Sequence, residues 1–183
     1  MLADSGLAYT VLRPNLFMDM AQRGFLGVGD LLQCADECEH PFAEASISMI
    51  DVRDVSDVAM TLLCAADPAA SPYCGRALDL TGPEPISFGG ALAAAVSEVR
   101  PRAVAVRPCA VEDFLSRSSL PPAATASLAG FLQVLKTRCA GVTDDVERIT
   151  GKPARTIAEH VAEHKDVFLP QERDAERNDA PAD

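Results

Sequence analysis

Short apolar runs and helically spaced apolar residues alternate along the first two-thirds of the chain. The apolar runs end at prolines, acidic residues or glycine turns, which predicts four short strands. We expect these strands at Ala8–Leu12, Ile47–Asp51, Arg76–Thr81 and Ala103–Arg107. Helical spacing follows the second and third runs, so the order strand, helix, strand, helix, strand predicts an α/β protein.

Local capping signals place several helix boundaries. Asp51 is suited to an N-cap, and Ser87 has the same role before the next apolar periodicity. The sequence Thr156-Ile-Ala-Glu159 is a capping box that opens a helix predicted over 157–168. A short helix that starts after a capping Thr143 should end at Gly151, a residue typical of a helix C-terminus.

The pattern divides the chain into three parts. Residues 1–109 form the α/β part, and glycines at positions 24, 27 and 29 predict a loop up to Ala45 that borders a binding site. Residues 110–169 are mostly helical, with further helices predicted over 112–118 and 123–138. Residues 170–183 are polar and acidic and are predicted to be a disordered tail.

Composition excludes several classes of function. The chain has 183 residues, 48% of them hydrophobic, and a net charge of -11, which fits a folded globular protein. The negative charge disfavours nucleic acid or an anionic membrane as partner, because phosphate binding needs clustered Lys and Arg. We find no secretory signal and no run long enough to span a membrane, so a cytoplasmic location is expected. The six cysteines are then expected to be reduced.

Two groups of residues have the chemistry of metal ligands but lack the usual spacing. Cys34, Cys38 and His40 have no second Cys/His pair to complete a zinc site. His160 and His164 lie one helical turn apart, but in the order His-Val-Ala-Glu-His rather than His-Glu-x-x-His. We therefore predict no metal site, and solvated histidines on the last helix.

Four segments in this order resemble the C-terminal portion of NmrA-like proteins, which are NAD(P)-binding atypical short-chain dehydrogenases. The resemblance runs from Asp4 to about Phe168. The segments are Ser5-Gly-Leu-Ala-Tyr-Thr-Val-Leu-Arg-Pro-Asn15, Ile50-Asp-Val-Arg-Asp-Val55, Leu80-Thr-Gly-Pro-Glu84 with Ile86-Ser87, and Val142-Thr-Asp-Asp-Val-Glu-Arg-Ile-Thr-Gly151.

The resemblance implies a partial Rossmann-type sheet, containing only the later strands, with a mostly helical C-terminal subdomain of the substrate-binding type. NAD(P) is the implied cofactor. The glycine-rich turn that normally holds the pyrophosphate has no counterpart here, because neither Gly-x-Gly-x-x-Gly nor Gly-x-x-Gly-x-x-Gly follows a strand. The Tyr-x-x-x-Lys pair of short-chain dehydrogenases is also absent from the sequence.

By the same resemblance, the segment after the first strand lines the cleft. The implied cofactor contacts are Arg13, Pro14 and Asn15, and the implied substrate-cleft residues are Phe17, Met18 and Arg53. Other roles stay open at these positions. Pro14 can simply end a strand, Phe17 and Met18 can pack in the core, and Arg53 can pair with Asp51 or Asp54, which we favour as helix N-terminal residues rather than paired catalytic acids.

Three functions remain open from the sequence. The first is part of an atypical short-chain oxidoreductase acting on a small organic substrate. The second is a non-catalytic NAD(P)-sensing regulator, and the third is an interaction module that no longer binds cofactor. Whether the chain is an enzyme is not decided by its residues. An unpaired apolar edge beside the first strand would favour self-association.

Overall fold

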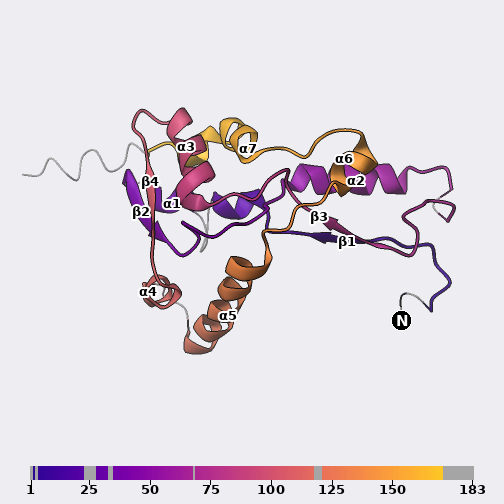
Figure 1. The fold of residues 1–183 in the computed structure, drawn as a ribbon, viewed down its shortest axis with the longest axis horizontal. Coiled ribbons are helices and arrows are strands. Elements are labelled where there is room, and N and C mark those ends of the chain that lie inside the picture. Colours follow the sequence, from indigo (N-terminus) through magenta and orange to yellow (C-terminus); the bar gives the residue numbers. More distant parts are fainter. Residues whose placement is uncertain are drawn as a thin grey trace, which may run out of the picture.

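Two short parallel sheets organise the chain, which is described here from a computed structural model over residues 2, 4–22, 28–32, 35–67, 69–117 and 121–170. In the first sheet β1 (Val11–Pro14) pairs with β3 (Ala77–Leu80), so that Leu12 lies beside Leu78. Helices α2 (Val52–Leu63) and α6 (Asp145–Thr150) lie with this sheet, on the right of Figure 1. The buried side chains of this group are Ile50, Val58, Leu78, Leu80 and Val146.

The second sheet pairs β2 (Glu37–His40) with β4 (Ala105–Pro108). Around it lie α1 (Val28–Leu32), α3 (Ala93–Val99), α7 (Ile157–Glu163) and α8 (Lys165–Phe168), on the left of Figure 1. A turn of π-helix, Phe88–Leu92, leads into α3, and a 3-10 turn, Met18–Ala21, follows β1. The larger core cluster of the chain fills this group, with Phe42, Phe88 and Phe168 fully buried.

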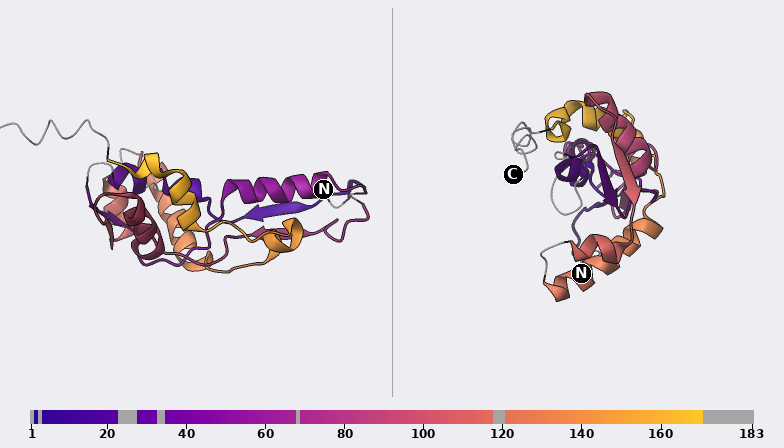
Figure 2. Two further views of the ribbon diagram at one scale, coloured as in Figure 1. Left: turned by 90° about the horizontal axis from the view of Figure 1, so that it is seen from above. Right: turned by 90° about the vertical axis from the view of Figure 1, so that its left-hand side faces the viewer.

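Two further helices extend from the larger core. Helix α4 (Val111–Ser116) follows β4, and α5 (Pro122–Arg138) projects away from the body of the molecule (Figure 1). Leu132 and Leu135 anchor α5 in the larger core, while Phe131 and Val134 on the same helix are about half exposed. Two further views show the elongated arrangement of the two sheet groups (Figure 2).

The capping predictions are confirmed except at Thr143, because the N-cap of α6 is Asp144, with no hydrogen bond from a capping side chain. The Asp51 side chain caps α2 by accepting the Arg53 N–H, and Ser87 accepts the Gly90 N–H. Both halves of the Thr156–Glu159 capping box are present. Gly151 ends α6 with φ +73°, a left-handed conformation that glycine adopts without strain.

Three predictions of local structure are wrong. The segment expected to be a loop contains α1 and β2, and β2 is stabilised by pairing with β4. Residues 47–51 form isolated bridges, Phe17 with Ile50 and Ile47 with Ile86, instead of a strand. The last helix breaks at His164 into α7 and α8.

The division of the chain at residue 109 stays a prediction. The larger core cluster draws residues from both sides of that position, including Phe42 and Ile157. The predicted tail 171–183 and the glycines at 24 and 27 lie outside the described residues. Within the described ranges, no helix combines the length and the apolar character needed to cross a membrane.

Candidate cofactor and substrate cleft

A cavity of about 430 Å³ opens at the carboxyl ends of β1 and β3. Both strands point toward the middle of the molecule, where the two sheet groups meet (Figure 1). The parallel pairing therefore brings the residues that follow each strand to one place. The lining residues are Arg13, Pro14, Asn15, Asp79, Thr81, Cys139, Gly141, Val142 and Thr143.

Asn15 joins this cavity to the end of α5. Its backbone N–H donates to the Leu80 carbonyl (2.9 Å), which continues the sheet pairing by one residue. Its Nδ2 donates to the Cys139 carbonyl (3.0 Å), and its Oδ1 accepts the Leu16 N–H (2.8 Å). The Ser48 N–H donates to the same Cys139 carbonyl at 2.7 Å. The Asn15 side chain thus fixes the position of the segment after α5 against the end of β1.

Two threonines connect the end of β3 to the segment before α6. Thr81 Oγ1 accepts the Thr143 N–H (3.0 Å), and Thr143 Oγ1 donates to the Asp79 carbonyl. The next residue, Gly82, passes so close to another segment that a Cβ atom there would lie 2.0 Å from the Met49 carbonyl oxygen. Only glycine allows this approach, so the Gly82 position is set by packing.

The outer rim of the cavity carries one ion pair. Arg13 and Asp79 lie opposite each other on β1 and β3, with Arg13 Nε and Nη2 at 2.8 and 2.9 Å from the two carboxylate oxygens. Both side chains are more than half exposed. An exposed pair of this kind contributes about 1 kcal/mol or less to folding, so its groups can exchange partners with a ligand at small cost.

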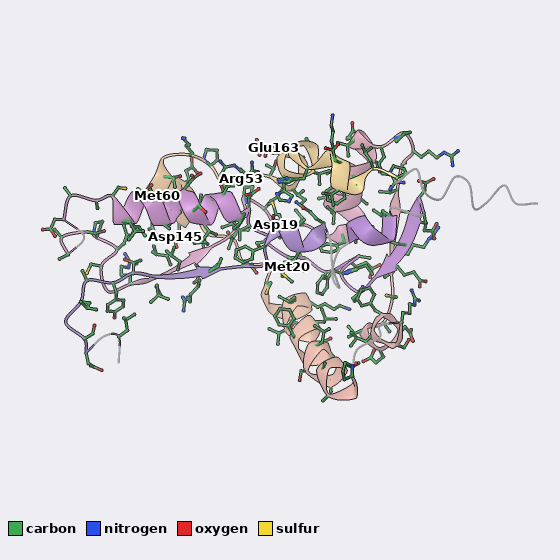
Figure 3. The ribbon with its side chains drawn as sticks, turned by 180° about the vertical axis from the view of Figure 1, so that it is seen from behind. Asp19, Met20, Arg53, Met60, Asp145 and Glu163 are labelled. Carbon is green, nitrogen blue, oxygen red and sulfur yellow. The ribbon has the colours of Figure 1, made fainter. Side chains whose placement is uncertain are left out.

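A second polar cluster lies between α2 and α7. The buried Asp51 carboxylate accepts from His160 Nδ1 (2.7 Å) and from Arg53 Nε (2.9 Å) and Nη2 (2.6 Å). Burial would raise the pKa of Asp51, but the hydrogen bonds from Arg53 and His160 outweigh it and hold that pKa well below its usual value. Gln22 contacts His160 Nε2 at 2.6 Å, and Arg53 also reaches Glu163 (Figure 3).

Comparison with known proteins shows what this arrangement is similar to. The chain is 31% identical over 173 residues to an NAD(P)H azoreductase of Xenophilus azovorans, covering 90% of this chain and 56% of that protein. It is 29% identical over 173 residues to a (4-alkanoyl-5-oxo-2,5-dihydrofuran-3-yl)methyl phosphate reductase of Streptomyces griseus, covering 92% and 57%. No family model matches the chain.

The solved structures share the fold. An NADPH-dependent quinone oxidoreductase from Escherichia coli superimposes with a TM-score of 0.71 at 20% identity, over 90% of this chain and 57% of that one. A triphenylmethane reductase from Citrobacter gives a TM-score of 0.68 at 19% identity, over 89% and 54%. The relatives include an NAD(P)H azoreductase and the fold is shared with an NADPH-dependent quinone oxidoreductase, which agrees with the resemblance to NmrA-like, atypical short-chain dehydrogenases. The chain spans about half the length of the relatives it matches.

The structure separates the residues implied by the resemblance into two sets. Arg13, Pro14 and Asn15 line the cavity together. Met18 is 2% exposed in the larger core, and Phe17 packs against the smaller one, so neither is among the lining residues.

Arg53 lies in the second polar cluster, paired with Asp51 and Glu163. Asp54, the other acid considered for Arg53, instead accepts the Arg155 N–H at 2.9 Å. Of the residues implied for the substrate cleft, none lines the cavity, and their roles there stay a prediction.

The prediction of solvated histidines is wrong for His160, which is 1% exposed. Its face of α7 is buried because it meets Asp51, a partner 109 residues away that helical periodicity cannot reveal. Cys139, Gly141 and Val142 were also missed as lining residues. Only the family segment that starts at Val142 gave a signal there.

Burial raises the pKa of three of the described cysteine thiols, Cys38, Cys109 and Cys139. Cys38, Cys64, Cys74, Cys109 and Cys139 are not in disulfides. Burial raises the pKa of Cys38 to about 11, which keeps that thiol protonated and unreactive near neutral pH. Cys34, which shares metal-ligand chemistry with Cys38 and His40, lies outside the described residues. The described residues hold no group of three or more side chains that could bind a metal ion.

Proposed function

We propose that this chain supplies the substrate side of an NAD(P)H-dependent reductase, with the cavity at the ends of β1 and β3 as the place where a small organic molecule meets the nicotinamide. The observation that carries the proposal is the position of the cavity. In open α/β sheets, ligands bind outside the carboxyl ends of parallel strands, and this cavity lies there. The names of the relatives, an azoreductase and a quinone oxidoreductase, support a reducible organic substrate.

The cavity fits one end of the cofactor better than the other. A pyrophosphate needs backbone N–H groups presented by a tight glycine turn at a strand end. The described glycines with positive φ are Gly6, Gly75 and Gly151, and none of them follows β1 or β3 directly. The cavity walls combine the Pro14 ring and the Val142 side chain with polar groups at the rim, which suits a flat ring carrying an amide.

When bound, the nicotinamide would supply a hydride; the residues of the chain would position and shield the reacting groups. The Asn15 side chain is hydrogen-bonded to the Leu16 N–H and the Cys139 carbonyl, so it acts by fixing the wall of the cavity. Arg13 and Asp79 form the rim, and Arg13 is the cation of the cavity lining that can meet an anionic or electron-rich substrate group.

Binding can be tested on this chain by following backbone amide NMR signals during titration with NADPH. We expect weak binding, in the millimolar range near -4 kcal/mol, because the described residues hold no pyrophosphate cradle. The shifted signals should be those of Asn15, Thr81 and Val142. Micromolar affinity would show that the chain grips the dinucleotide by itself, and shifts confined to other regions would contradict the proposed cleft.

Two valines offer a matched pair of variants for this titration. Val142 lines the cavity and is 45% exposed, whereas Val134 lies on α5 and is 50% exposed. Val142→Trp should fill part of the cavity and weaken NADPH binding about tenfold or more, equivalent to about 1.4 kcal/mol. Val134→Trp should bind as the unmodified chain does. Equal binding by the two variants would remove the cavity from the proposal.

A further inference from the structure

The uncharged polar side chains of the cavity are hydrogen-bonded within the chain itself. Asn15 is bonded to the backbone of Leu16 and Cys139. Thr81 Oγ1 accepts the Thr143 N–H, and the hydroxyl groups of both threonines donate to backbone carbonyls. These side chains shape the cavity, and their hydrogen bonds are used in doing so. Recognition of a ligand therefore depends mainly on the charged groups of the lining.

The two charged residues among the described lining residues form one bidentate pair. Arg13 and Asp79 are register partners on β1 and β3, so their side chains lie on the same face of the sheet. Arg13 Nε and Nη2 donate to the two carboxylate oxygens of Asp79 at 2.8 and 2.9 Å. This is the strongest arrangement that a guanidinium and a carboxylate can make. The guanidinium N–H groups that do not face Asp79 remain for a ligand.

We infer that this pair is a charge filter, in which Asp79 makes the cavity prefer an uncharged ring with a hydrogen-bond acceptor over the same ring with a carboxylate. The inference rests on the proposed function, because it names the class of substrate for the same cavity. A neutral carbonyl oxygen can accept from the remaining N–H groups of Arg13 while the pair stays closed. A ligand carboxylate has to take the bidentate position from Asp79, whose charge then stays at the rim and repels it.

The surroundings of the pair favour the same choice. Asp144 is exposed, makes no capping hydrogen bond and lines a neighbouring cavity of about 660 Å³. The two cavities share Val142 and Thr143, so the Asp144 carboxylate lies close to the rim. The whole chain carries a net charge of -11. An anionic ligand therefore meets a negative potential on its approach, and an uncharged one does not.

Two naphthalene probes of the same shape test the filter at neutral pH. One is 2-naphthamide, which is uncharged, and the other is 2-naphthoate, which carries a carboxylate. Each is titrated into the chain while the backbone amide NMR signals of Asn15, Thr81 and Val142 are followed. We expect 2-naphthamide to bind at least about tenfold more tightly. Asp79→Asn should raise the affinity for 2-naphthoate about tenfold and change that for 2-naphthamide by less than about twofold.

Three variants separate the filter from other effects. Asp79→Glu keeps the charge and should keep the preference for 2-naphthamide. Adding Arg13→Gln to Asp79→Asn should remove the gain in affinity for 2-naphthoate, because the guanidinium that receives the carboxylate is gone. Asp113→Asn makes the same change of net charge at an exposed position on α4, outside the cavity lining, and should leave both affinities unchanged.

The outcomes distinguish this inference from the proposed function. An unchanged ratio of the two affinities in Asp79→Asn would overturn the filter, even where NADPH shifts the cavity signals. Tighter binding of 2-naphthoate than of 2-naphthamide by the unmodified chain would overturn it too, as would binding of neither probe at these signals. A reversed preference in Asp79→Asn without any shift by NADPH would uphold the filter and reject the nicotinamide site.

Discussion

Removing the charge of Asp51 is the most informative single perturbation of the fold. Asp51 is buried at the start of α2 and accepts hydrogen bonds from His160 and Arg53. A carboxylate can only accept, so His160 Nδ1 carries the proton of the 2.7 Å contact. The change Asp51→Asn keeps an N-cap of comparable quality, because asparagine also accepts the Arg53 N–H. It therefore isolates the electrostatic role of the residue from its capping role.

The loss can be worked out from the contacts. Hydrogen bonds to charged groups contribute about 1.5–3 kcal/mol each. The contact with His160 counts in full, because both side chains are 1% exposed. The contact with Arg53 is discounted, because the Arg53 side chain is 37% exposed to water. Together we expect a loss of about 3 kcal/mol, which in a domain of this size lowers the melting temperature by about 6–12 °C.

The assay is urea unfolding of the chain and the Asp51→Asn variant across pH. The pKa of folded Asp51 is held well below its ordinary value of 3.8, so its stabilisation is present above the unfolded pKa and is lost as pH falls toward the folded one. The stability difference should stay constant from neutral pH to about pH 4 and shrink below it. The exposed Asp19 gives a control, Asp19→Asn, with little effect. A difference independent of pH down to acid denaturation would refute the reasoning.

Three further outcomes follow from the packing. Gly82→Ala should destabilise the chain by about 2 kcal/mol or more in urea unfolding, because its Cβ would lie 2.0 Å from a backbone oxygen, whereas Gly130→Ala, with open space around it, should not. Arg100→Met should cost about 3 kcal/mol, because the buried guanidinium donates to the carbonyls that end α1 and α8; Arg102→Met, 82% exposed, is the control, and equal effects would contradict this. Native-state hydrogen exchange should be faster in β3 than in α3, since the smaller core has far fewer buried residues; equal protection would contradict this.

The elements predicted correctly from sequence are those with local signals. The Asp51 cap, the Thr156–Glu159 capping box and the Gly151 terminus each depend on side chains within a few residues of the backbone group they satisfy. The segment after position 24 was misjudged because β2 is held by β4, whose partner residues lie about seventy positions further on, such as Arg107 for Glu39. A short polar strand of that kind carries no periodicity of its own.

The residues that line the cavity also include some that the sequence implied and some that it did not. Arg13, Pro14 and Asn15 could be implied from the sequence because they follow a recognisable strand within a family segment. Cys139 could not, because its role depends on a backbone carbonyl that accepts from Asn15, 124 residues earlier. His160 was missed for the same reason, since a histidine on a helix shows its burial only when the facing element is known.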